Sequence, residues 1–132
     1  METLEMSAEF KVSPQRLYEA WLDGEEHSAF TGSGASGEPQ VGGQYTAWDG
    51  YIQGVNLELE PYRRIVQSWR TTEFPEASPD SRLELILEAV KGATRITLHH
   101  TDIPDGQEEM YREGWEEYYF KPMRAYFEPE AG

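Results

Sequence analysis

The sequence predicts an α+β fold, in which a curved antiparallel sheet of about six strands wraps around one long C-terminal helix. Residues 4–12 alternate between apolar and polar side chains, which is typical of a strand. Further alternating segments joined by short turns follow between residues 44 and 103, and short turns favour antiparallel neighbours. From residue 105 to about residue 128 the apolar period changes to 3.6, which predicts a helix more than about 30 Å long. Only this helix is large enough to cover the apolar face of the sheet.

Two short helices are expected directly after the first strand. Ser13 followed by Pro14 is typical of a helix N-cap and the first helical residue. Apolar residues then recur at helical spacing, namely Leu17, Tyr18, Trp21 and Leu22. A second helix with acidic residues in its first turn follows Gly24 and ends at Gly32. The glycine-rich residues 32–43 lack the lysine of a phosphate-binding loop, so they predict an ordinary loop.

Asp49 and Gly50 predict a two-residue hairpin turn, because both central positions of such a turn need positive φ. This turn would place Trp48 opposite Tyr51 and Thr46 opposite Gln53. The same face of the second strand would continue through Val55, Leu57 and Leu59.

The remaining strands each predict one apolar face. Ile65, Gln67 and Trp69 share a face of the next strand. The last two strands form a hairpin around Lys91 and Gly92, and their apolar faces hold Leu83, Leu85, Leu87, Ala89, Ile96, Leu98 and His100.

The long helix predicts an aromatic stripe toward the sheet, made of Tyr111, Trp115, Tyr118, Tyr119, Pro122 and Tyr126. Pro122 removes one backbone donor and should kink the helix near Tyr118. Phe120 and Phe127 fall off the stripe, so they could form an exposed surface for a protein partner or pack on a neighbouring subunit or on the first strand.

The composition narrows the function. The chain of 132 residues has the length of a single domain, residues 1–132, and it has no cysteine and a net charge of −14. Such a charge repels phosphate backbones and anionic lipids, so neither nucleic acid nor a membrane is an expected partner. Without a long apolar run, a signal peptide or a transit peptide, the expected location is cytoplasmic.

Three stretches carry a family resemblance: GGQYTAWDGYIQGVNLELEPYRRIVQSWR, the paired LELILEAV and TRITLHHTDIP, and REGWEEYYFKPMRAYF. They resemble homologues of the C-terminal domain of the activator of the heat-shock protein 90 ATPase. These homologues belong to the superfamily of START-type lipid-transfer proteins, polyketide cyclases and birch-pollen allergens.

The resemblance implies a helix-grip fold with a cavity between the sheet and the long helix. Members of the superfamily bind apolar ligands, and a few catalyse cyclisation or dehydration. In the full-length eukaryotic activator a separate N-terminal domain makes much of the chaperone contact. Because Met1 already begins the first expected strand, we expect that domain to be absent here, which argues against a chaperone partner.

The leading hypothesis is therefore a module that binds a small hydrophobic or aromatic molecule in this cavity. Gln53 and Gln67 on apolar faces suit a wet or ligand-filled cavity better than a sealed core. His100 could be a polar anchor in the cavity or a hydrogen-bonded core residue. The expected lining is Trp48, Tyr51, Gln53, Gln67, Trp69, Leu85, Leu87, Leu98, His100, Trp115, Tyr118 and Tyr119.

Catalysis has no evident machinery in the sequence, so we assign no catalytic residue, metal ligand or cofactor. His99 and His100 are neighbours on a strand and face opposite sides, so they cannot clamp one metal ion. Two alternatives stay open. One is a cyclase- or hydrolase-type enzyme with His100 as general base. The other is a protein-interaction module related to chaperone regulation and the stress response, in which a homodimer could also form.

Overall fold

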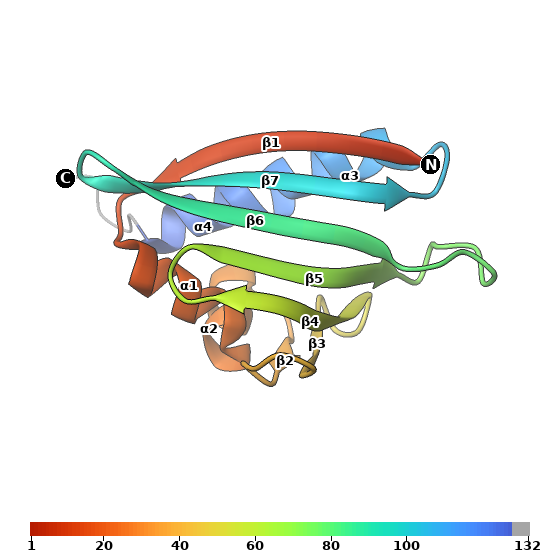
Figure 1. The fold of residues 1–132 in the computed structure, drawn as a ribbon, viewed down its shortest axis with the longest axis horizontal. Helices are drawn as coiled ribbons and strands as arrows, with labels where there is room; N and C mark the ends of the chain where they lie inside the picture. Colours follow the sequence, from red (N-terminus) through yellow and green to blue (C-terminus); the bar gives the residue numbers. More distant parts are fainter. Residues whose placement is uncertain (128–132) are drawn as a thin grey trace.

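The computed structural model describes residues 1–127, in which seven strands form one curved antiparallel sheet (Figure 1). The order across the sheet is β1-β7-β6-β5-β4-β3-β2, so the N-terminal strand pairs with the last one. The strands are β1 Glu2–Phe10, β2 Ser36–Gly37, β3 Gln44–Ala47, β4 Ile52–Glu60, β5 Arg64–Thr71, β6 Ser81–Val90 and β7 Ala93–Ile103. The additional strand beyond the expected six is the two-residue β2, within the glycine-rich segment that we expected to be a loop.

The helices lie where the sequence placed them. They are α1 Pro14–Leu22, α2 Gly24–Thr31, α3 Glu108–Gly114, a π-helical segment η1 Trp115–Phe120, and α4 Lys121–Phe127. Ser13 Oγ caps α1 by accepting from the Arg16 N–H at 3.1 Å, and Gly32 ends α2 with a φ of 80°. Figure 1 shows the C-terminal helix running along one face of the sheet, behind β1, β7 and β6 in this view, with α1 and α2 gathered near its α4 end.

The core lies between the sheet and the C-terminal helix. The predicted inner faces of β5, β6 and β7 are confirmed for the following residues, which are all buried: Ile65, Gln67, Trp69, Leu83, Leu85, Leu87, Ile96, Leu98 and His100. Ala89, predicted on the same face near the end of β6, is instead exposed. From the helix side the buried residues are Tyr111, Trp115, Tyr119, Phe120, Met123 and Phe127.

The predicted face of β4 is wrong, although the predicted pairing of Thr46 with Gln53 is confirmed. Ile52 and Asn56 are buried, whereas Gln53 is exposed and Leu57 is 44% exposed. A bulge between Asn56 and Glu58 then shifts the register. The wrong assignment already begins at Ile52 and Gln53, which lie before the bulge. Beyond the bulge, Leu59 packs against the core as predicted, because one extra residue exchanges the two faces of a strand.

Of the alternatives given for Phe120 and Phe127, the exposed surface is wrong and packing on the first strand is confirmed. They are 2% and 8% exposed, and their ring centroids lie 6.0 and 6.4 Å from that of Phe10 in β1. Tyr118, expected on the buried stripe, is instead 60% exposed. The cause is η1, where the Lys121 N–H bonds back to the Glu116 carbonyl five residues before it.

A π-helical turn contains an extra residue, which displaces the side chains that follow by about 100° around the helix axis. The segment includes Tyr118, near which Pro122 was expected to disturb the helix. The irregularity in the helix therefore lies at the expected place, and it changes which aromatic side chains of the helix are buried.

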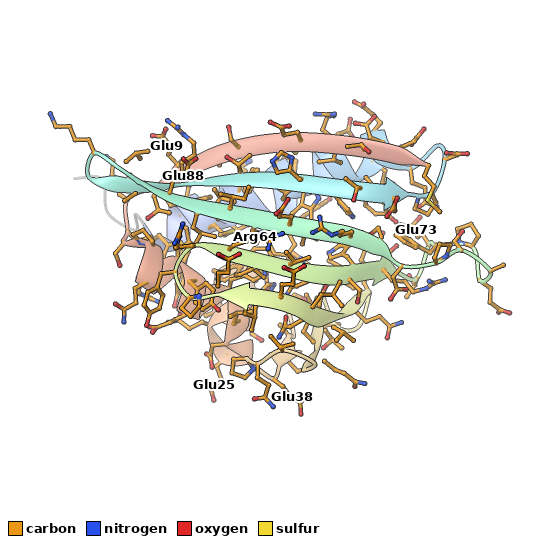
Figure 2. All side chains as sticks on the ribbon, viewed as in Figure 1. Glu9, Glu25, Glu38, Arg64, Glu73 and Glu88 are labelled. Carbon is orange, nitrogen blue, oxygen red and sulfur yellow. The ribbon has the colours of Figure 1, made fainter. Side chains whose placement is uncertain are left out.

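The outer surface is acidic, and Arg64 shows how part of that charge is balanced (Figure 2). Its guanidinium contacts carboxylates of Glu84 at 2.6 Å, Glu58 at 2.8 Å and Glu60 at 3.2 Å. These acceptors, Glu84 above all, raise the pKa of Arg64.

Within the described residues, no helix has the length and apolar character needed to cross a membrane.

The burial pattern predicts different costs for two identical substitutions in the sheet. Leu85→Ala should lower the free energy of unfolding by about 2–5 kcal/mol, because it opens a cavity under the helix. Leu57→Ala should cost less than about 1 kcal/mol, because its side chain remains largely in solvent. Urea unfolding of both variants measures the difference, and equal costs would contradict the assignment of the β4 faces.

Candidate functional site

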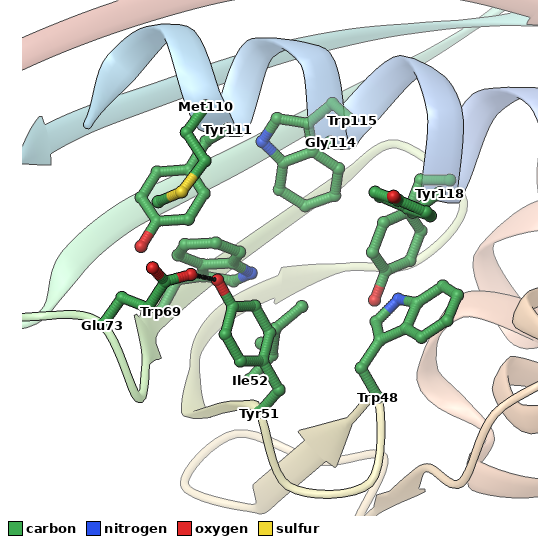
Figure 3. A pocket seen from close by; sticks show the side chains of 11 residues that line it. Trp48, Tyr51, Ile52, Trp69, Glu73, Met110, Tyr111, Gly114, Trp115 and Tyr118 are labelled. Atoms are coloured by element: carbon green, nitrogen blue, oxygen red, sulfur yellow. Dashed lines mark hydrogen bonds between the residues drawn. The ribbon is translucent and has the colours of Figure 1, made fainter.

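A cavity of about 410 Å³ lies between the β3–β4 turn, β5 and the C-terminal helix (Figure 3). Its surface is almost entirely apolar. The residues that line it are Trp48, Tyr51, Ile52, Trp69, Glu73, Met110, Tyr111, Gly114, Trp115, Tyr118 and Tyr119. Met110 and Tyr118 are among the exposed large apolar side chains, so the cavity is open to solvent beside them.

The hairpin turn supplies one wall of this cavity. Asp49 and Gly50 both have positive φ, 57° and 90°, as predicted, but the strands end at Ala47 and Ile52, so the connection has four residues rather than two. Trp48 also has a positive φ of 54°, which is unusual for a large side chain. This conformation breaks the alternation of β3, so Trp48 faces the helix, with its ring centroid 5.7 Å from that of Tyr118.

The Asp49 carboxylate fixes the turn in place. It accepts hydrogen bonds from the Ser33 hydroxyl and from the Gly34 N–H, both at 2.9 Å. The Asp49 N–H in turn donates to the Gly34 carbonyl at 2.8 Å. The loop after α2 therefore holds the wall that carries Trp48 and Tyr51.

Trp69 and Trp115 form the floor of the cavity, with ring centroids 5.6 Å apart. Trp115 donates its indole N–H to Nδ1 of His100 at 3.2 Å, which leaves the ring hydrogen on Nε2. His100 Nε2–H then donates to Ser81 Oγ at 2.8 Å, and Ser81 donates to the Trp69 carbonyl at 2.7 Å. One histidine thus ties together both tryptophans of the floor.

His100 is fully buried, and this burial lowers its pKa to about 3. It does not line the cavity, and both of its ring nitrogens are engaged. The core reading of His100 is therefore the correct one, and the polar-anchor reading is wrong. The hydrolase or cyclase alternative loses its named base, because a neutral, sealed imidazole cannot reach a substrate in this cavity.

His27 plays the same part for Tyr119. Its Nδ1–H donates to the Trp21 carbonyl at 2.9 Å, so its Nε2 accepts from the Tyr119 hydroxyl at 2.8 Å. Burial lowers the pKa of His27 to about 4 and raises the pKa of Tyr119. The Trp48 indole N–H is buried and has no hydrogen-bond partner of good geometry within residues 1–127.

The polar groups of the cavity gather at its mouth. The Tyr51 hydroxyl donates to the Glu73 carboxylate, and burial together with this hydrogen bond raises the pKa of Tyr51. Tyr111 donates to Gln107 Oε1 at 2.8 Å and shares a 2.6 Å hydrogen bond with Thr71. Figure 3 shows Glu73 and Tyr51 at the edge of the ring cluster, joined by their hydrogen bond.

The aromatic members of the predicted site are brought together around the cavity: Trp48, Tyr51, Trp69, Trp115, Tyr118 and Tyr119. The other predicted members lie elsewhere. Gln53 is exposed on the outer face of β4, whereas the following residues are buried in the core and do not line the cavity: Gln67, Leu85, Leu87, Leu98 and His100.

Gln67 lies in a polar network of the core rather than in a wet cavity. Its amide oxygen accepts from the Trp21 indole N–H at 3.3 Å, and its NH₂ group donates to Asn56 Oδ1 at 2.8 Å. Asn56 passes the network on to the Glu38 carbonyl at 2.9 Å. A buried amide with these partners is satisfied, so no water or ligand is needed to explain it.

Some lining residues were not predicted: Ile52, Glu73, Met110, Tyr111 and Gly114. Tyr111 belongs to the aromatic stripe of the helix, and Gly114 precedes Trp115, so the sequence pattern could have identified both as lining residues. Glu73 follows the end of β5, where no periodicity indicates which way a side chain points.

Among the described residues, no three histidine, aspartate or glutamate side chains come together in a way that could hold a metal ion.

A curved antiparallel sheet that holds a long C-terminal helix, with an apolar cavity between them, defines the helix-grip class of fold. The chain belongs to the family described as Activator of Hsp90 ATPase homolog 1-like protein, whose model matches residues 11–128. The resemblance seen in the sequence is thus confirmed.

The similar proteins differ in length. The human activator of 90 kDa heat shock protein ATPase homolog 1 is 32% identical over 118 residues, which cover 89% of this chain and 35% of that protein. The chain therefore spans about a third of the length of the curated relatives that it matches. The crystal structure of an Hsp90 activator from Plasmodium falciparum superposes with a TM-score of 0.87 at 25% identity, over 94% of both chains. The solution structure of the Aha1 dimer from Colwellia psychrerythraea superposes over all of both chains with a TM-score of 0.80 at 17% identity, and this shows the fold alone.

The two buried histidines predict that stability falls on acidification. Their pKa values in the folded protein, about 3 and about 4, lie below the ordinary value of about 6.5. The unfolded chain therefore takes up protons first, so stability is complete above about pH 6.5 and is lost as the pH falls toward 4. Each proton should contribute up to about 1.4 kcal/mol per pH unit.

Urea unfolding between pH 7 and pH 5 measures this slope. His27→Gln and His100→Gln should each reduce the slope by about half. The slope reports the proton uptake even where the substitution also lowers stability at neutral pH. A stability that does not change over this range would contradict the burial of two neutral imidazoles.

Proposed function

We propose that this domain binds a small apolar molecule with aromatic character in the cavity between the β3–β4 turn, β5 and the C-terminal helix. One observation carries the proposal: a cavity of about 410 Å³, walled by aromatic rings, persists beside a core that is otherwise closely packed. Pockets for small molecules typically measure about 300–1,000 Å³ and are largely apolar.

The wall residues favour a flat ligand. Trp48 stands on one side, and Trp69 and Trp115 form the floor, so rings from the turn, from β5 and from the helix surround the space. Stacked or edge-on contacts with such rings contribute about 0.5–1.5 kcal/mol each beyond the burial of area. The floor is held by the hydrogen bonds of His100 and Ser81, so little ordering is needed when a ligand enters.

Gly114 offers a substitution that fills the cavity without disturbing the core. A Cβ at this position would meet nothing closer than Tyr118 Cδ2 at 4.0 Å. Gly114→Leu should weaken binding of a neutral apolar probe at least about tenfold, because the leucine occupies the space of the ligand. The measurement is a titration followed by tryptophan fluorescence, since three tryptophans line the cavity.

The neighbouring Glu113→Leu is the matched control, since it introduces the same side chain on the same helix at a residue that does not line the cavity. Both variants should remain folded, and Gly114→Leu should gain up to about 1 kcal/mol from helix propensity. The proposal fails if the unmodified protein shows no saturable fluorescence change, or if both variants bind the probe equally well.

A second candidate function is regulation of a chaperone of the Hsp90 class. The supporting observation is the family, and in particular the activator from Plasmodium falciparum, whose matched chain has nearly the same extent as this one. The interaction surface expected from the sequence is not the one to use, because Phe120 and Phe127 are buried.

The second candidate predicts that the purified chain increases the ATP hydrolysis rate of an Hsp90 chaperone. With a net charge of −14, contact with a basic partner surface should weaken as salt rises. The assay is a steady-state ATPase titration at low and at high salt, with Gly114→Leu included. An unchanged rate at saturating protein in low salt would exclude this function, and equal activation by Gly114→Leu would separate it from the cavity.

A further inference from the structure

The charged side chain in the lining of the cavity is negative. Among the described residues that line it, Glu73 is the one acidic side chain, and none is lysine, arginine or histidine. Figure 3 shows its carboxylate beside the rings of Tyr51 and Trp69, at the edge of the cavity. Any polar group that a ligand leaves at this mouth therefore lies next to a negative charge.

The protein does not neutralise this charge itself. Several carboxylates elsewhere are paired with a basic side chain, as with Glu84 and Arg64 at 2.6 Å. No basic side chain of residues 1–127 lies within 4.0 Å of the Glu73 carboxylate. The one hydrogen bond to it among these residues comes from Tyr51, and a carboxylate can accept several more.

Arg70, three residues earlier in the chain, is directed elsewhere. It binds the Asp80 carboxylate at 2.9 Å and the Pro75 carbonyl at 2.9 Å. Its guanidinium also lies 5.4 Å from the centre of the Phe74 ring. These contacts hold the nearest arginine along the chain away from Glu73, so a positive charge at the mouth has to come from the ligand.

The rings strengthen the same preference. The faces of Trp and Tyr rings carry negative potential and attract cations within about 6 Å. Trp48, Trp69 and Trp115 all line the cavity. The net charge of −14 also raises the concentration of cations, and lowers that of anions, around the molecule.

We infer that the ligand of this cavity is an organic cation: a molecule with an apolar, ring-sized body and an amine or quaternary ammonium group. The body lies between Trp48 and Trp115, and the positive group lies at the mouth beside Glu73 and the Tyr51 ring. This inference rests on the proposed binding function and adds the charge of the ligand. Carboxylated or sulfonated ligands of the same size are disfavoured.

The test compares probes that share one ring system and differ in charge. Naphthylmethylammonium, naphthylmethanol and naphthoate are titrated into the full chain by calorimetry at low salt. The cation should bind roughly tenfold more tightly than the alcohol, the size expected of cation–π contacts together with a carboxylate. Naphthoate should bind more weakly than either.

Glu73→Gln removes the charge but keeps an oxygen that can accept from Tyr51. It should reduce the affinity for the cation roughly fivefold and leave the affinity for the alcohol unchanged. Glu76→Gln is the matched control, because Glu76 carries the same charge in the same loop and does not line the cavity. This control should leave all three affinities within error of the unmodified protein.

The outcomes separate the two proposals. If the alcohol binds but the cation has no advantage, or if naphthoate binds most tightly, the inference about charge is overturned and the binding function stands. A preference for the cation that survives Glu73→Gln unchanged would overturn the role of Glu73. If no probe binds, the binding function fails and the inference fails with it.

Discussion

The contact between Trp115 of the C-terminal helix and Trp69 of β5 is the interaction on which the rest of the structure depends. It fixes the height of the helix above the sheet. Toward α4 the space is filled by Phe120, Met123 and Phe127, all buried. Toward the β3–β4 turn the same pair of rings leaves the cavity. One aromatic contact therefore divides the interface into a closed half and an open half.

Histidines give this contact its orientation. An indole N–H or a phenol hydroxyl that is buried needs a hydrogen-bond partner, and the choice of partner decides how the ring lies. Trp115 finds its partner in His100, and Tyr119 finds one in His27. Both imidazoles are neutral because burial disfavours their charged form. They act on the cavity through the rings that they hold, without lining it.

The two functions proposed for the domain would use different parts of it. Binding of a small molecule needs the cavity and its mouth, whereas regulation of a chaperone needs an outer surface, which is strongly acidic. The η1 segment affects both the closed and the open half of the interface, because it turns Phe120 inward and leaves Tyr118 at the cavity rim. Tyr118 both lines the cavity and is exposed. A ligand that moves its side chain would therefore also change the surface that a protein partner can contact.

Where strands are regular, the sequence was sufficient. The alternation in β5, β6 and β7 assigned the inner residues correctly except Ala89 near the end of β6, because in an undisturbed strand the face follows from position alone. Ser13, Pro14 and Gly32 marked helix boundaries correctly, because capping depends on the residues next to the helix end. Asp49 and Gly50 likewise identified their turn through local backbone preference.

By itself, then, the sequence determined the α+β class, the family, the helix under the sheet and the aromatic residues that meet between them. Only the tertiary structure decided the face of Leu57, the exposure of Tyr118, the engagement of His100 and the presence of Glu73 at the cavity mouth. Each of these depends on a break in periodicity or on a contact between residues far apart in the chain. The position of a bulge, of a π turn and of a loop side chain is set by packing across the whole molecule, and a local sequence pattern does not contain that information.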